Sequence, residues 1–277
     1  MLTGWLGRYL DATGVKDNTL QGLSLDGQLS PTLATARVPV AAMDGASYGF
    51  WTKNVWGKVE NRLYESVREL GAADATAVGG VTLQSMRLRE QMLPFQGDDD
   101  HPAFKSPVAY PDGDSSFPKQ LAALAAMIGA GLPLRCVSVE AAGSYDTHSD
   151  QADGLASDLS LTAKSLLAFQ RDLEARGLAD RVVVHVWSEF GRRAEENGSA
   201  GTDHGAAGTG FLIGSRVNGR LVGEFPGLTN GLDEDGNLRA TADFRGVYGA
   251  LLEQWLDFDA AQVIPNAASY PRPTLIR

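Results

Sequence analysis

The sequence of 277 residues contains a single cysteine and no long hydrophobic run. An internal disulfide is therefore impossible, and Cys136, within the apolar run 134–139, is expected to be a buried structural thiol rather than a nucleophile. No run approaches the length of a transmembrane helix. The opening residues, MLTGWLGRYLDATG, lack the basic segment and apolar core of a signal peptide.

Basic residues are also in short supply. Lys and Arg number 24 against 34 Asp and Glu, which gives a formal net charge of −10. A nucleic-acid-binding surface needs a basic face, and so does adhesion to an anionic membrane, so neither partner is expected. A small anionic substrate remains compatible with this charge, because a bound metal ion can invert the local field. With 277 residues, 43% of them hydrophobic, the chain is long enough for one large α/β domain or two small ones.

Several familiar motifs are missing. The sequence contains no GxSxG nucleophile elbow, no Walker loop and no GxGxxG fingerprint. Gly208-Thr209-Gly210 lacks the remainder of a dinucleotide-binding motif.

Periodicity predicts a mixed α/β chain. Apolar residues at helical spacing predict helices over residues 3–10, 58–70, 75–92, 118–130, about 150–177 and 243–256, and apolar runs predict strands over 36–42, 134–140, 181–187 and 211–213. The pair Gly79-Gly80 is a weak point of its helix. Residues 97–118 predict a surface loop. Its cluster Asp98 to His101 is interpreted as a solvated acidic segment, with a cation site as the less favoured alternative.

The order strand, loop, helix, strand from residue 134 to residue 187 predicts a parallel βαβ unit with a right-handed crossover. Both strands end in segments that carry Asp, His or Glu. The carboxyl ends of parallel strands lie at one edge of a sheet, so these segments are expected to converge. The polar segment between Glu189 and His204 is expected to be a Gly-rich loop.

The candidate ligands in these segments are Asp146, His148, Glu189, Asp203 and His204. Mixed carboxylate and imidazole ligands suit Zn, Mn or Fe, and with fewer nitrogens Mg or Ca. Alternatives remain open: Glu189 can form a salt bridge with Arg192 or Arg193, and the two histidines can serve in caps or in the core. His185 lies within a strand and is interpreted as a core or sheet-face residue.

Three motifs carry a resemblance to a known family. YDTHSDQ at 145–151, SEFGR at 188–192 and GTDHG at 201–205, in this order, resemble the DUF1501 family, uncharacterised bacterial proteins assigned to the alkaline phosphatase and sulfatase superfamily. The resemblance implies a single α/β domain over residues 1–277, with three layers, a mostly parallel sheet and helices on both of its faces. It also implies hydrolysis of a small anionic phosphate or sulfate ester at a centre holding divalent metal, whether Zn, Mn, Mg or Ca.

By this resemblance Asp146, His148, Glu189, Asp203 and His204 are metal ligands, and Arg192 binds substrate. Phe190 stands where better-known enzymes of the superfamily have a metal-binding histidine. The relatives are expected to begin with an export signal, a strand and the segment that carries the nucleophile, so the resemblance implies an N-terminally truncated fold. The exposed sheet edge would then be covered by another element or a second copy of the chain. The alternative function is a non-catalytic metal- or anion-binding remnant or interaction module.

Overall fold

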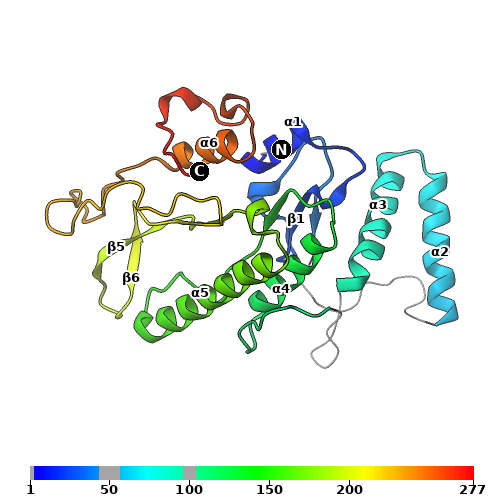
Figure 1. Ribbon diagram of the computed structural model, residues 1–277, viewed down its shortest axis with the longest axis horizontal. Helices are drawn as coiled ribbons and strands as arrows, with labels where there is room; N and C mark the ends of the chain where they lie inside the picture. The colour runs from blue at the N-terminus through cyan, green and yellow to red at the C-terminus, as the bar shows by residue number, and fades with distance from the viewer. Residues whose placement is uncertain (1–2, 44–56, 96–103) are drawn as a thin grey trace. The chain divides into compact units, whose positions relative to one another are not determined.

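The computed structural model describes residues 3–43, 57–95 and 104–277, and the chain divides into two compact units. The first unit consists of Met1–Pro107 and Ser116–Glu140, and the second of Val108–Ser115 and Ala141–Arg277. Helices and strands are mixed along the chain, and one small sheet is parallel (Figure 1). None of the helices in the described part is both long and apolar enough to cross a membrane.

The first unit is built around a three-stranded parallel sheet in the order β2-β1-β3. Its helices and strands are α1 (Trp5–Thr13), β1 (Gly22–Ser24), β2 (Ala41–Ala42), α2 (Lys58–Ala73), α3 (Ala77–Met92), α4 (Ser116–Gly129) and β3 (Cys136–Ser138), with short 3-10 turns at Thr19–Gln21, Pro31–Leu33 and Leu93–Phe95. The central strand β1 is buried along its whole length. A central strand of a parallel sheet has neighbours on both edges and is covered on its faces, which explains this burial.

Helix α4 packs beside this sheet. Its Ala- and Leu-rich sequence buries most of its side chains, and the buried amide of Gln120 donates a hydrogen bond of 2.7 Å to the carbonyl of Leu25. Cys136, on β3, is 6% exposed, and burial raises the pKa of its thiol to about 12. The expectation that Cys136 is buried is confirmed.

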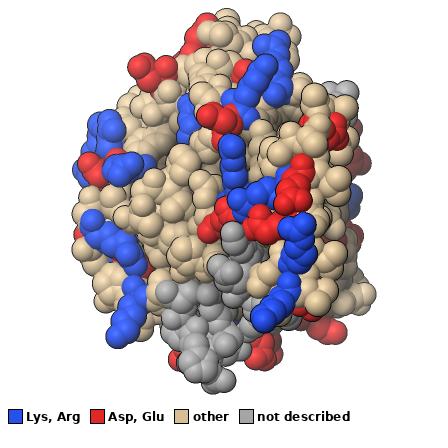
Figure 2. All heavy atoms as spheres, turned by 90° about the vertical axis from the view of Figure 1, so that its right-hand side faces the viewer, with Lys and Arg blue, Asp and Glu red and all other residues tan. Residues whose placement is uncertain are grey.

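Helices α2 and α3 lie side by side as a helical hairpin (Figure 1). Helix α3 runs unbroken through Gly79-Gly80, so the expected weak point does not interrupt it. Position 79 requires glycine for a steric reason, because a Cβ on Gly79 would lie 2.1 Å from the carbonyl oxygen of Asp74, where α2 turns into α3. On the face that these helices present, Lys and Arg mix with Asp and Glu (Figure 2), and Arg62 pairs with Glu69 at 3.6 Å.

The second unit contains two helices and two antiparallel strand pairs among the described residues. They are α5 (Gln151–Ala175), β4 (Val184–Val186), β5 (Gly191–Glu196), β6 (Thr202–Gly205), β7 (Phe211–Ile213) and α6 (Phe244–Gln254), with short 3-10 turns at Ala179–Arg181, Ala260–Gln262 and Ala267–Ser269. Gly177, with φ +68°, ends α5 as predicted. The side chain of Asp243 caps α6 by accepting from the backbone N–H of Arg245 at 2.8 Å.

The predicted parallel βαβ unit is wrong. Strand β3 pairs with β1 in the first unit, whereas β4 pairs antiparallel with β7 in the second. An apolar run such as residues 182–187 predicts a strand but does not encode its partner, and the nearby run 211–213 supplies one through a short connection.

The stretch between β4 and β7 is also more ordered than the expected loop. His185 pairs with Leu212 in the β4–β7 ladder, and Arg192 pairs with His204 in the β5–β6 ladder. The paired positions in both ladders are arranged nearly symmetrically about the same turn. Residues 184–213 therefore form one long interrupted hairpin, here called the β-arm. Its tip is the turn at residues 197–201 (Figure 1).

Candidate metal site

The β-arm places two ionisable residues opposite each other. Arg192 on β5 and His204 on β6 are direct partners in the ladder. Side chains of directly opposite residues project from the same face of a two-stranded ribbon, so both reach the same neighbouring segment. That segment is the site loop, residues 145–150, which leads into α5.

Backbone hydrogen bonds join the site loop to the tip of the β-arm. The N–H of Thr202 donates to the carbonyl of Thr147 at 3.2 Å, and the N–H groups of Asp150 and Gln151 donate to the carbonyls of Ser199 and Ala200, each at 3.0 Å. Asp150 is the N-cap residue of α5, but its side chain makes no capping bond. Carbonyls of the arm tip satisfy the first N–H groups of the helix instead.

Side chains complete this joint. Gln151 accepts hydrogen bonds of 3.0 Å from both Thr147 and Thr202. Asn197 stabilises the tip turn by accepting from the N–H groups of Ser199 and Gly201, and it donates to the carbonyl of His148 at 3.0 Å. The contact leaves no space for a side chain at Gly201, where a Cβ would lie 2.2 Å from a backbone carbon of His148.

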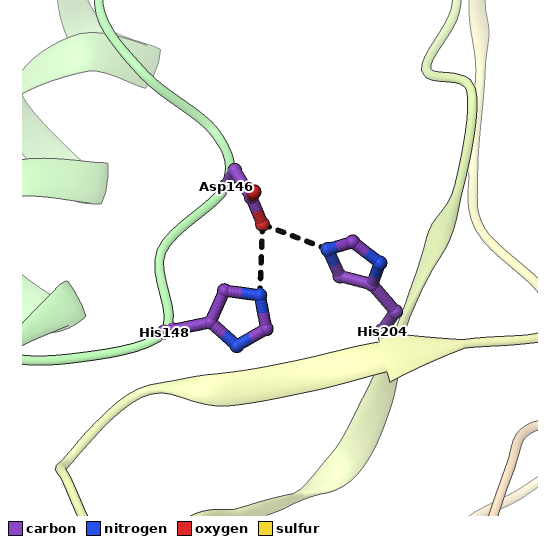
Figure 3. Close-up of side chains that lie close together, drawn as sticks. All are labelled: Asp146, His148 and His204. Atoms are coloured by element: carbon purple, nitrogen blue, oxygen red, sulfur yellow. Dashed lines mark hydrogen bonds and ion pairs between the residues drawn. The ribbon is translucent and has the colours of Figure 1, made fainter.

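Three side chains meet where the loop and the arm join. One carboxylate oxygen of Asp146, Oδ1, lies 3.0 Å from His148 Nε2 and 2.8 Å from His204 Nε2 (Figure 3). The same oxygen accepts a hydrogen bond of 2.9 Å from Arg192 Nη2. Three nitrogens from two segments of the chain therefore converge on a single oxygen atom.

The surrounding charges favour the ionised carboxylates. The hydrogen bond from His204 lowers the pKa of Asp146, and the charges of His148, His204 and Arg192 lower it further. The pKa of Asp203 is lowered by its hydrogen bonds with Asn197 (3.1 Å) and His148 (3.4 Å to Nδ1), with a smaller contribution from the charge of Arg193. Both carboxylates are thus held in the form that can bind a cation.

The donor atoms are spaced for a metal ion. Ligand atoms of Asp146, His148 and His204 all lie within 4.8 Å of one another. With bonds of about 2.0–2.1 Å, neighbouring ligand atoms around a tetrahedral Zn²⁺ lie roughly 3.3 Å apart. The two shortest separations, 2.8 and 3.0 Å, are close to this value, so small side-chain movements would admit an ion. All three residues are about half exposed, which leaves room for a further ligand.

An aromatic ring supports the site. Phe190 stacks on the imidazole of His204, with ring centroids 3.9 Å apart and an interplanar angle of 14°. The guanidinium of Arg192 lies 5.1 Å from the centre of the same phenyl ring. Phe190 therefore orients the imidazole ring of His204.

The other candidate residues are not members of the three-residue cluster. Asp203 contacts the far ring nitrogen of His148 rather than the shared centre. Glu189 is exposed and forms no hydrogen bond or ion pair with any residue that the structure describes, so neither its role as ligand nor the alternative salt bridge gains support. His185 is half-buried in β4 with its ring edge-on to Tyr248. The acidic cluster Asp98 to His101 lies outside the described residues.

Sequence reasoning missed three residues of the joint: Phe190, Asn197 and Gln151. The segment Asn197-Gly198-Ser199-Ala200-Gly201 has the composition of a tight turn, in which an Asn side chain commonly bonds the backbone two residues ahead. That signal was available and predicts a hairpin tip. Phe190 and Gln151 lie within the motifs SEFGR and YDTHSDQ, but these motifs do not indicate the contacts that the two residues make.

Comparison with known families assigns the chain. A family model described as a protein of unknown function, DUF1501, matches residues 2–243. The chain belongs to the DUF1501 family. No curated protein and no solved structure matches it. The site loop, the β-arm and the candidate metal site of this DUF1501 protein all lie inside the matched region.

Proposed function

We propose that this DUF1501 protein binds a divalent metal ion through Asp146, His148 and His204. The observation that carries the proposal is the convergence of three ligand atoms, from residues up to 58 positions apart, on one exposed spot. Two imidazoles and one carboxylate favour Zn²⁺ or Mn²⁺ over Mg²⁺ and Ca²⁺, which prefer all-oxygen sites.

We further propose that Asp203 supports this site without binding the ion, by orienting the ring of His148. Metal-binding histidines commonly donate their other ring N–H to a carboxylate, which fixes the tautomer and the ring orientation. Asp203 stands beside His148 Nδ1, and Asn197 holds the Asp203 carboxylate in place. This arrangement would leave His148 Nε2 directed toward Asp146 and the metal.

The chemistry best suited to such a centre is hydrolysis of phosphate or sulfate esters, of the kind found in alkaline phosphatases and sulfatases. A bound metal ion would act there as a Lewis acid on the ester oxygen and would lower the pKa of a coordinated water. Arg192 is committed to the carbonyls of Tyr145 and Thr202 and to Asp146, so it braces the loop. The exposed neighbour Arg193 is the better candidate to meet an anionic ester.

A non-catalytic metal-binding role is the second candidate, and one observation favours it. The hydroxyl groups of Thr147 and Thr202, which lie in the joint, both donate to Gln151. Each hydroxyl proton therefore stabilises the loop, and neither residue is placed as a nucleophile.

Metal content of the purified chain tests the proposal. We expect about one Zn²⁺ or Mn²⁺ per chain by elemental analysis after metal loading and desalting, and loss of that ion in Asp146→Asn and His204→Ala. Asp153→Asn, an exposed carboxylate on α5, and His185→Gln serve as matched controls and should retain it. Unchanged stoichiometry in His204→Ala would refute the ligand assignment, and lowered stoichiometry in Glu189→Gln would add Glu189 to the site.

Turnover of p-nitrophenyl phosphate and p-nitrophenyl sulfate by the metal-loaded chain separates the two candidate functions. Hydrolysis by the wild type that is lost in Asp146→Asn would support the proposed hydrolysis of phosphate or sulfate esters. A chain that binds its metal fully but hydrolyses neither ester would favour the non-catalytic role.

A further inference from the structure

A second candidate site lies on α5, within the second unit. Residues 108–111 pass over this helix and leave a hollow of about 430 Å³ between the two segments. Leu167 and Ala168 form its floor, Tyr110 and Pro111 form a wall, and Lys164 and Arg171 stand at its ends. We call this space the α5 hollow. Its volume falls in the range of sites for small ligands.

The charged side chains that line the α5 hollow, Lys164 and Arg171, are of one sign. Lys164 and Arg171 lie seven residues apart on one face of α5, roughly 10 Å along the axis. Neither forms an ion pair with any residue that the structure describes. The carboxylates of Asp112 and Asp114 follow on the passing segment but do not line the space. Two cations that have no ion pair with a described residue therefore line one hollow of a chain whose formal net charge is −10.

The floor between these cations is apolar and accessible. The side chain of Leu167 is 50% exposed although it lies in the middle of the helix face. A large exposed aliphatic group between two cations matches a ligand with an apolar body and an anionic group. It matches inorganic phosphate less well, because a small ion would leave the Leu167 side chain in water.

The wall is held in place by a buried anchor. The Tyr110 hydroxyl donates to Asp172 at 3.1 Å, and Arg176 pairs with the same carboxylate at 2.6 Å. Asp172 is fully buried, so its charge is satisfied by these partners beneath the hollow. Separating the buried Asp172 carboxylate from its partners would cost free energy, because its charge would then be buried and unpaired. The hydrogen bond from Tyr110 therefore holds residues 108–111 in place in the absence of a ligand.

We propose that the α5 hollow binds a small organic anion, with the apolar body of the ligand on Leu167 and its carboxylate, sulfonate or phosphate group on Lys164 and Arg171. The proposal is independent of the metal site, because it shares no residue with it.

The test uses the full chain and the fluorescent aryl sulfonate 8-anilinonaphthalene-1-sulfonate as the probe. We expect saturable binding to one site and a roughly tenfold weaker Kd in the double variant Lys164→Gln/Arg171→Gln, from the loss of two partly exposed charge contacts. Lys58→Gln/Arg87→Gln removes the same charge from exposed positions on α2 and α3 and should bind like the wild type. 1-Naphthoate should compete with the probe, whereas the neutral 1-naphthylmethanol should compete at least tenfold less well.

The location is read from methyl NMR signals. Binding at the α5 hollow requires the probe to shift the methyl signals of Leu167 and Ala168. Shifts confined to other methyl groups, equal affinity in the two double variants, or fluorescence that never saturates would each overturn the proposal.

Discussion

Asp203 offers the sharpest test of how the candidate metal site is built. The sequence patterns place Asp203 among the ligands, whereas in the structure its carboxylate lies 3.4 Å from His148 Nδ1, on the side of the ring away from Asp146. A residue in that position orients a ligand without binding the ion. Asp203→Asn keeps the size of the side chain and removes its charge.

The expected effect is a loss of affinity without a loss of stoichiometry. Removing the outer partner of a metal-binding histidine costs about 10–100-fold in affinity, or roughly 1.4–2.7 kcal/mol. Zn²⁺ affinity would be measured by competition with a chromophoric chelator at fixed pH. Asp203→Asn should still bind one ion at saturation, but with a Kd raised by that factor. Asp146→Asn should fail to saturate over the same range.

Asp153→Asn controls for the loss of one negative charge near the start of α5. A Kd unchanged in Asp203→Asn would refute the supporting role of Asp203. Failure to saturate, as in Asp146→Asn, would instead make Asp203 a direct ligand.

Three further predictions concern the framework. Gly201→Ala should separate the arm tip from the site loop, because the added Cβ would lie 2.2 Å from the backbone of His148. This variant should therefore have a lower Tm and a lower metal affinity. The control Gly198→Ala should change neither quantity, because no atom lies within 4 Å of its added carbon. Burial lowers the pKa of His185 from 6.5 to about 4, so the unfolded chain binds a proton that the folded chain does not as pH falls through this range. Stability should therefore decline from pH 6.5 to pH 4 by up to about 3 kcal/mol more in the wild type than in His185→Gln, measured by urea unfolding at each pH. Leu252→Ala, at a fully buried position of α6, should cost about 2–5 kcal/mol in the same assay, and a loss below 1 kcal/mol would contradict its place in the core.

Helices were the most predictable part of the fold, because periodicity is local. The predicted helix over 58–70 appears as α2, Lys58–Ala73, and the one over 75–92 as α3, Ala77–Met92. Strand pairing was not predictable, since a short apolar run fits several partners. Residues 134–140 and 181–187 both contain strands, but the two strands belong to different sheets. Pairing is decided by tertiary contacts that a single sequence does not display.

The residues of the candidate site were partly predictable, but the expected arrangement of strands that would bring them together was wrong. Asp146 and His204 were expected to meet at the edge of one parallel sheet. They meet because the β-arm turns its tip onto the site loop, where Gly201 permits close approach and Asn197 bonds both segments. Residue types nominated five candidate ligands, and the structure brings three of them, Asp146, His148 and His204, close together. The positions of Glu189 and Asp203 relative to the shared centre depended on the register of the arm, and no local pattern specifies that register.

The hydrogen bonds at Asp146 also explain how a half-exposed site can hold its shape before an ion binds. One oxygen of Asp146 accepts from Arg192 and lies within 3.0 Å of both His148 Nε2 and His204 Nε2. These separations resemble those between ligands of one metal ion, so binding would exchange the Asp146–His204 hydrogen bond and the Asp146–His148 ion pair for coordination bonds with little movement of the chain. Arg192 would keep its bonds to the backbone throughout, because its partners are the carbonyls of Tyr145 and Thr202. Folding of the arm onto the loop would thus order the ligand side chains before the metal binds. Little of the free energy of metal binding would then be lost in ordering them, which would favour tight binding by only three side chains.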